Sequence, residues 1–71
     1  MDARMNARSD AIEYAHILEQ GARNSLCQAF ERHTPAGWVK VRITGRGVLV
    51  WFVNDKRVSR AFVINSLEEN A

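Results

Sequence analysis

The sequence contains a single cysteine, Cys27, among its 71 residues. One thiol cannot form an internal disulfide, so the chain is not a secreted scaffold that disulfides hold together. Small domains without disulfides are typical of reducing compartments. We therefore expect a cytoplasmic protein.

The sequence also has no long apolar run. No stretch approaches the ~18 consecutive apolar residues of a membrane-spanning helix. The opening residues, MDARMNAR, are charged and contain no apolar segment, so they do not have the pattern of a signal peptide. These two absences predict a protein without a membrane partner.

Residues suited to catalysis are few. Cys27 and His33 are six positions apart, which does not place them on one face of a helix, and no carboxylate is spaced to orient His16 or His33. We interpret Cys27 as a small, at least partly buried apolar residue, His33 as a cation at a helix C-terminus and His16 as solvent-exposed. The three or four clustered ligands of a metal site do not occur. We predict that the protein is not an enzyme and has no metal or cofactor.

The composition is that of a small soluble domain, with 46% apolar and 25% charged residues. A chain of this length buries only ~60% of its unfolded surface, so a partner or a second copy often completes its core. We expect a flexible N-terminus over residues 1–8, a single domain over residues 9–66 and a flexible acidic tail over residues 67–71.

Residues 9–33 have the apolar period of one helix. Ser9 or Asp10 is placed to cap its start, and Asp10 with Glu13 has the capping-box spacing. Gly21 either kinks this helix or splits it in two; we favour one continuous helix, because the apolar stripe keeps its phase across Gly21. Pro35 ends the helix, since it disfavours helical backbone at the preceding residue. The stripe consists of Ala11, Tyr14, Ala15, Leu18, Ala22, Leu26, Ala29, Phe30 and His33.

Residues 37–64 predict three strands. Gly45-Arg46-Gly47 suits a tight hairpin turn and is too short for a phosphate-binding loop, and Asn54-Asp55 or Asp55-Lys56 forms the second turn. Together with the helix, these strands predict an α+β fold: one N-terminal helix packed on a three-stranded antiparallel β-meander (α-β-β-β) in two layers.

Side chains alternate between the two faces of a strand, which assigns each residue of the predicted sheet to a face. The face that we expect to receive the helix contains Val39, Val41, Ile43, Val48, Val50, Phe52, Ala61 and Val63. The face that we expect to stay open contains Trp38, Lys40, Arg42, Leu49, Trp51, Val53, Val58, Arg60, Phe62 and Ile64.

Positive charge is concentrated in the predicted sheet. Residues 36–66 contain six lysine or arginine residues and one acid, whereas residues 1–35 contain four arginines and five acids. Monomers rarely expose a large apolar patch without a function for it. The mixture of aromatic and cationic residues on the open face therefore predicts a binding surface, formed by Trp38, Lys40, Arg42, Arg46, Trp51, Lys56, Arg57, Arg60 and Phe62.

Three kinds of partner fit such a surface. Cations contact phosphates and aromatic rings stack on bases, so we expect a small, non-catalytic regulatory protein of the bacterial or phage kind that docks on nucleic acid or on a nucleoprotein assembly such as the transcription machinery. The alternative is a stoichiometric inhibitor or adaptor that binds an acidic host protein, because tryptophan and arginine also dominate protein interfaces. A homodimer is the third option, although a two-fold contact of these faces brings like charges together.

Residues 37–45, GWVKVRITG, resemble the glycine–aromatic–x3–Arg–x2–Gly segment of the small messenger-RNA-cleaving toxins of the Hic toxin–antitoxin class. Those toxins are similar in fold to double-stranded-RNA-binding domains, with a sheet after a helix. The family has its catalytic histidine just after the second glycine, where this chain has Arg46, Gly47 and Val48. The resemblance therefore implies a layout that is able to serve RNA, without the cleavage activity.

Overall fold

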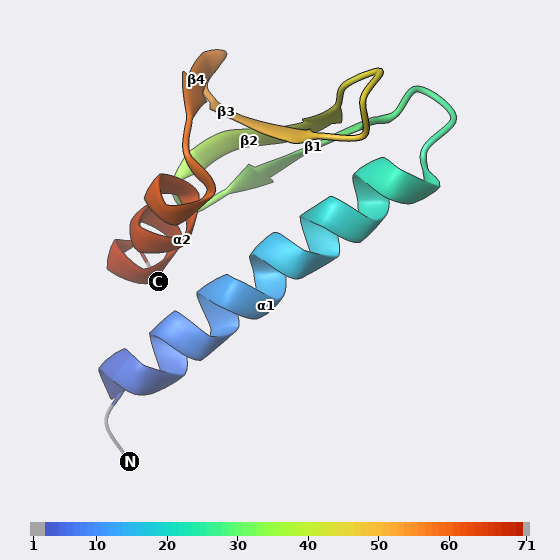
Figure 1. Ribbon diagram of the computed structural model, residues 1–71. Helices are drawn as coiled ribbons and strands as arrows, with labels where there is room; N and C mark the ends of the chain where they lie inside the picture. The colour runs from blue at the N-terminus through green and yellow to red at the C-terminus, as the bar shows by residue number, and fades with distance from the viewer. Residues whose placement is uncertain (1–2, 71) are drawn as a thin grey trace.

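The computed structural model describes residues 3–70, which form a small α+β fold (Figure 1). A long helix comes first, four antiparallel strands follow, and a second, shorter helix ends the described chain. In chain order the elements are α1 (Ala3–Asn24), β1 (Ala29–Thr34), β2 (Gly37–Ile43), β3 (Leu49–Val53), β4 (Lys56–Val58) and α2 (Arg60–Glu69). The predicted fold class is confirmed in outline, but the prediction lacked one strand and one helix.

Helix α1 begins six residues before the predicted start and ends nine residues before the predicted end, at Asn24. Its buried positions are spaced as the sequence indicated: Ala11, Ala15, Leu18 and Ala22 all face the core. The helix is continuous through Gly21. A Cβ atom at Gly21 would lie 2.6 Å from the Phe30 ring, so this glycine allows β1 to approach the helix closely.

Strand β1 corrects the predicted C-terminal part of the helix. Gln28 has a positive φ of 55°, which ends any helical path after α1. The next six residues then pair with β2 along their whole length, from Ala29 opposite Arg42 to Thr34 opposite Gly37. His33 is thus a strand residue and does not complement a helix C-terminus. The three- and four-residue spacing of Leu26, Ala29, Phe30 and His33 is incidental, because pairing with β2 overrides this local pattern.

The sheet is an antiparallel meander in the order β1-β2-β3-β4. Both predicted turns occur. Gly45-Arg46-Gly47 lies within the β2–β3 loop, where the Thr44 side chain accepts hydrogen bonds from the amides of Arg46 and Val48. Asn54 and Asp55 join β3 to β4 with φ angles of 50° and 70°, and two successive positive values are the signature of a type I′ hairpin turn.

Helix α2 replaces most of the predicted third strand. Ser59 caps it: the Ser59 hydroxyl oxygen accepts a hydrogen bond from the Phe62 amide at 3.0 Å. Val63, Ile64 and Leu67 are buried, and this spacing of one and four residues is helical. The strand therefore ends at Val58, and Arg60 to Ile64 do not belong to the sheet.

The predicted flexible ends overlap the two helices. Helix α1 includes residues 3–8 and helix α2 includes residues 67–69; residues 1–2 and 71 lie outside the described residues. At this end of the molecule the Arg8 side chain donates to the carboxylate of Glu68 at 2.9 Å and to the side-chain oxygen of Asn65 at 3.2 Å. The flexibility of both ends stays a prediction.

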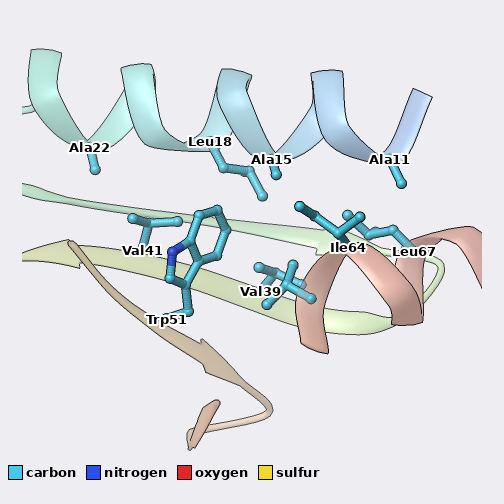
Figure 2. Close-up of a cluster of buried hydrophobic side chains, with 10 residues drawn as sticks. Ala11, Ala15, Leu18, Ala22, Val39, Val41, Trp51, Ile64 and Leu67 are labelled. Carbon is cyan, nitrogen blue, oxygen red and sulfur yellow. The ribbon is translucent and has the colours of Figure 1, made fainter. Parts of the chain in front are cut away.

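Both described helices pack on the same face of the sheet, and the core lies between them and the strands. Figure 2 shows the α1 alanines and Leu18 directed at Val41 and Trp51 of the sheet and at Ile64 and Leu67 of α2. Trp51 is only 4% exposed. We call this the covered face. The opposite face carries no other part of residues 3–70 (Figure 1), and we call it the open face.

The predicted faces were correct for β2 and wrong for β3. Val41 lies opposite Trp51, and paired residues of neighbouring strands share a face. Trp51 therefore belongs to the core together with Leu49, Val53 and Val58, all of which had been assigned to the open face. Val50 and Phe52, which had been assigned to the core, lie on the open face instead. A shift of one residue in register exchanges the two faces of a strand.

Candidate binding face of the sheet

The open face is defined by the register of the four strands. Because paired residues share a face, each row across the sheet follows from the pairing. The central row runs Glu31, Lys40, Phe52, Arg57 from β1 to β4. On one side of it lie Ala29, Arg42 and Val50, and on the other side lie His33 and Trp38. The face thus combines aromatic rings, three cations and one carboxylate.

Trp38 is the largest exposed group of this face, with 51% of its surface accessible. Its backbone is fixed by Asn54 in the β3–β4 turn: the Trp38 amide donates to Asn54 Oδ1 at 3.0 Å, and the Asn54 amide donates to the Trp38 carbonyl at 2.8 Å. Gly37 makes this possible, because its φ is 111° and a Cβ atom there would lie 2.8 Å from the Asn54 side chain. The sequence therefore holds the indole in a defined place at the start of β2.

Two ring contacts organise the aromatic residues. The His33 and Trp38 rings meet in a T-shaped arrangement, with centroids 5.1 Å apart and an angle of 71° between the planes. The Lys40 ammonium lies 5.4 Å from the centroid of the Phe52 ring, which is within the range of a cation–π interaction. Trp38 thus contacts a neighbouring ring, whereas Phe52 carries a cation over its ring.

The charge of the open face is positive. Arg42 and Arg57 are exposed, and Lys40 is half-buried beside Phe52. Glu31 is the one acid in the rows that the register defines, and it lies opposite Lys40 on the edge strand. The residues predicted for the open face include no acid, because β1 was expected to be part of the helix. Arg46 lies exposed in the β2–β3 loop, at one end of the sheet.

Four of the nine predicted binding residues lie together on the open face: Trp38, Lys40, Arg42 and Arg57. Lys56 is exposed at the start of β4, but it pairs with Val53 and so lies at the rim of the covered face. Trp51 is a core residue. Arg60 belongs to α2, where its guanidinium binds the Glu19 carboxylate of α1 at 3.0 and 3.1 Å. Phe62 is also on α2, where it is half-exposed.

Five residues of the open face were not predicted to belong to it: Ala29, Glu31, His33, Val50 and Phe52. A signal for Phe52 and Val50 was present. A three-residue turn over residues 45–47 places Thr44 opposite Val48, and the same register places Lys40 opposite Phe52. Glu31 and His33 had no such signal, because only the pairing of β1 with β2 brings them to this face.

The candidate catalytic residues do not form a site in the described structure. Cys27 is exposed in the α1–β1 loop, which corrects our interpretation of it as a buried apolar residue. His16 is exposed on α1, as predicted, and His33 contacts Trp38 on the open face. Among residues 3–70 there is no group of three or more His, Cys, Asp and Glu residues placed to hold a metal ion.

Neither described helix is long and apolar enough to cross a membrane.

Comparisons with protein-family models, curated proteins and solved structures find no match to this chain. The resemblance of residues 37–45 to the Hic toxins therefore depends on those residues alone.

Proposed function

We propose that this protein is a small, non-catalytic nucleic-acid-binding protein that uses the open face of its sheet. One observation carries the proposal. An exposed tryptophan, a lysine–phenylalanine pair and two exposed arginines share the one sheet face that residues 3–70 leave uncovered. This is the combination of rings and cations that sheet surfaces use to bind unpaired bases and their phosphates.

The cations provide the sequence-independent part of the binding. Lys40 and Arg42 lie on β2 and Arg57 lies on β4, with β3 between them, so together they extend positive charge across the face rather than along one edge. Each phosphate that a cation neutralises on a single strand contributes about −0.7 to the slope of log K against log salt, so three contacts give a slope of about −2. The Glu31 carboxylate repels phosphate at the β1 edge. We therefore expect the sugar–phosphate backbone of the nucleic acid to run nearer to β2, β3 and β4.

Trp38 provides the aromatic part. Half of its surface is accessible although its backbone is held by Asn54, so a base stacks on it without ordering the protein further. Stacking of one base on an aromatic side chain contributes ~1–3 kcal/mol, as measured by substitution with alanine. A regulatory protein of this kind acts by occupying nucleic acid, or a nucleoprotein assembly that presents it.

The test is fluorescence anisotropy with a labelled single-stranded oligonucleotide of mixed sequence, over a series of salt concentrations. We expect log-linear weakening with a slope of about −2. Arg42→Ala is expected to weaken binding and to flatten that slope by about 0.7. Arg23→Ala is the matched control, because it removes the same charge from the exposed end of α1 and leaves the open face intact.

Absence of binding at low salt contradicts the proposal, and so does binding that survives both Trp38→Ala and Arg42→Ala. A partner protein that binds the same face with little dependence on salt supports the alternative, an inhibitor or adaptor that contacts an acidic host protein. Self-association through the open face, seen in sedimentation and lost in Trp38→Ala, supports the homodimer.

A further inference from the structure

A shallow hollow adjoins the exposed indole of Trp38. Its lining consists of Trp38, Glu31, Asn54 and Asp55, and its volume is about 380 Å³. The two carboxylates come from different parts of the chain, one from β1 and one from the β3–β4 turn. An aromatic surface, a side-chain amide and two hydrogen-bond-accepting carboxylates therefore meet at the end of a face that is otherwise cationic.

Spacing on the open face favours an unpaired strand over a duplex. Lys40 lies opposite Phe52, so Trp38 and Phe52 are diagonal neighbours on adjacent strands. Such neighbours are ~7–8 Å apart, about twice the rise of ~3.4 Å per nucleotide in a stacked strand. Two adjacent bases reach both rings only if they are unstacked from each other. A duplex also keeps the faces of its bases inside the stack, where neither ring has access to them.

The hollow distinguishes between bases. The amino groups of cytosine, adenine and guanine are hydrogen-bond donors, and carboxylates accept from the amino group of cytosine in protein–nucleic-acid complexes. Thymine and uracil present a carbonyl oxygen at the same position, and a carbonyl next to a carboxylate leaves both acceptors without a donor. A base that stacks on Trp38 with this edge in the hollow is therefore favoured when it carries an amino group.

We infer that the ligand is single-stranded nucleic acid, with one amino-bearing base stacked on Trp38 and its amino group donating to Glu31 or Asp55. The inference rests on the proposed function and adds to it the class of ligand and a preference at one position. The next base has access to Phe52 once Lys40 leaves the ring, and the ammonium is then free to bind a phosphate.

Anisotropy titrations with labelled oligo(dC), oligo(rC), oligo(dT) and a duplex of the same length test the inference. We expect the two cytosine strands to bind about fivefold more tightly than oligo(dT), the ratio that one net hydrogen bond supplies. The duplex is expected to bind more weakly than either cytosine strand. Equal affinities for oligo(dC) and oligo(rC) show that the protein recognises the base. Tight binding of only the DNA strand or only the RNA strand overturns the assignment to Glu31 and Asp55.

Glu31→Gln tests the carboxylate, with Asp55→Asn as its partner variant and Glu13→Gln as the control of equal charge on the exposed side of α1. We expect the ratio of the affinities for oligo(dC) and oligo(dT) to fall toward one in the double variant Glu31→Gln/Asp55→Asn. The same ratio is expected to stay unchanged in Glu13→Gln. Equal affinity of the unaltered protein for oligo(dC) and oligo(dT), or tighter binding of the duplex, overturns the inference and leaves the proposed function standing. Absence of binding to all four probes overturns both.

Discussion

The Lys40 ammonium lies 5.4 Å from the centroid of the Phe52 ring, on adjacent strands of the open face. The two residues thus combine a phosphate-binding charge and a stacking surface at the centre of the face. Both residues are half-buried, and a cation–π pair is worth ~0.5–1 kcal/mol at an exposed site and ~2 kcal/mol when desolvated. A ligand that displaces this contact therefore has to offer Lys40 a phosphate and Phe52 a base.

Phe52 is expected to contribute to binding more than to folding. Replacing it by alanine removes one stacking surface, and we expect a loss of ~1–3 kcal/mol in binding free energy. Phe52→Tyr keeps the ring and is expected to retain the affinity. Anisotropy titrations with oligo(dC) measure the affinity of both variants. A Phe52→Ala protein that binds as tightly as the unaltered one contradicts the role of the central row.

The two tryptophans are expected to respond in opposite ways to substitution. Trp51 is 4% exposed in the core and Trp38 is 51% exposed on the open face. Trp51→Ala removes a buried aromatic side chain and is expected to lower the free energy of unfolding by ~3–5 kcal/mol, which is enough to unfold a small domain. Trp38→Ala is expected to fold normally and to lose oligonucleotide binding. Urea denaturation followed by far-UV circular dichroism separates the two effects, and similar destabilisation by both variants contradicts the assignment of faces.

Gly21 is expected to be required for the contact between α1 and β1. Alanine at an exposed helical position usually stabilises a helix by ~1 kcal/mol relative to glycine. At Gly21 the added Cβ atom would meet the Phe30 ring at 2.6 Å, and such overpacking typically costs ~1–3 kcal/mol. We therefore expect Gly21→Ala to be neutral to destabilising in a urea titration. Gly21→Ala combined with Phe30→Ala is expected to show less than additive losses; strict additivity means that the two residues do not meet.

Arg57 and Arg60 are close in sequence and are expected to differ in function. Arg57 is exposed in the central row of the open face, whereas Arg60 binds Glu19 across the two helices. Arg57→Ala is expected to weaken oligonucleotide binding and to flatten its salt dependence. Arg60→Ala is expected to leave binding unchanged and to lower stability by about 1 kcal/mol, since Arg60 is exposed to solvent although Glu19 is mostly covered. Equal losses of binding in the two variants place the ligand on α2 as well.

The parts of the fold that could be predicted from the sequence are those with an unambiguous local period. The stripe from Ala11 to Ala22 fits only a helix, and the alternation over residues 37–43 fits only a strand. The two turns contain glycine or Asn-Asp, which are residue types that favour tight turns. Strand β1 has no such mark. Residues 29–34 continue the helical spacing of the stripe and show no apolar–polar alternation, so their pairing with β2 is what makes them a strand.

The candidate site was predicted in part for a related reason. Alternation on β2 placed Trp38, Lys40 and Arg42 correctly, because one strand defines its own faces. The relation between β2 and β3 depends on register, and a difference of one residue exchanged Trp51 for Phe52. The alternation of Val58, Phe62 and Ile64 imitates a strand that continues past the end of β4 into α2. The helical signal was Ser59 as a cap, followed by Val63, Ile64 and Leu67.

The most direct test of the central claim is an NMR titration of the ¹⁵N-labelled protein with oligo(dC). We expect shifts in the indole Nε1–H signal of Trp38 and in the backbone amides of the central row, with the Trp51 indole and the exposed α1 positions Ile12 and Ile17 unchanged. This result places the ligand on the open face. Shifts that are confined to α1 and α2, with the Trp38 indole unaffected, contradict the claim.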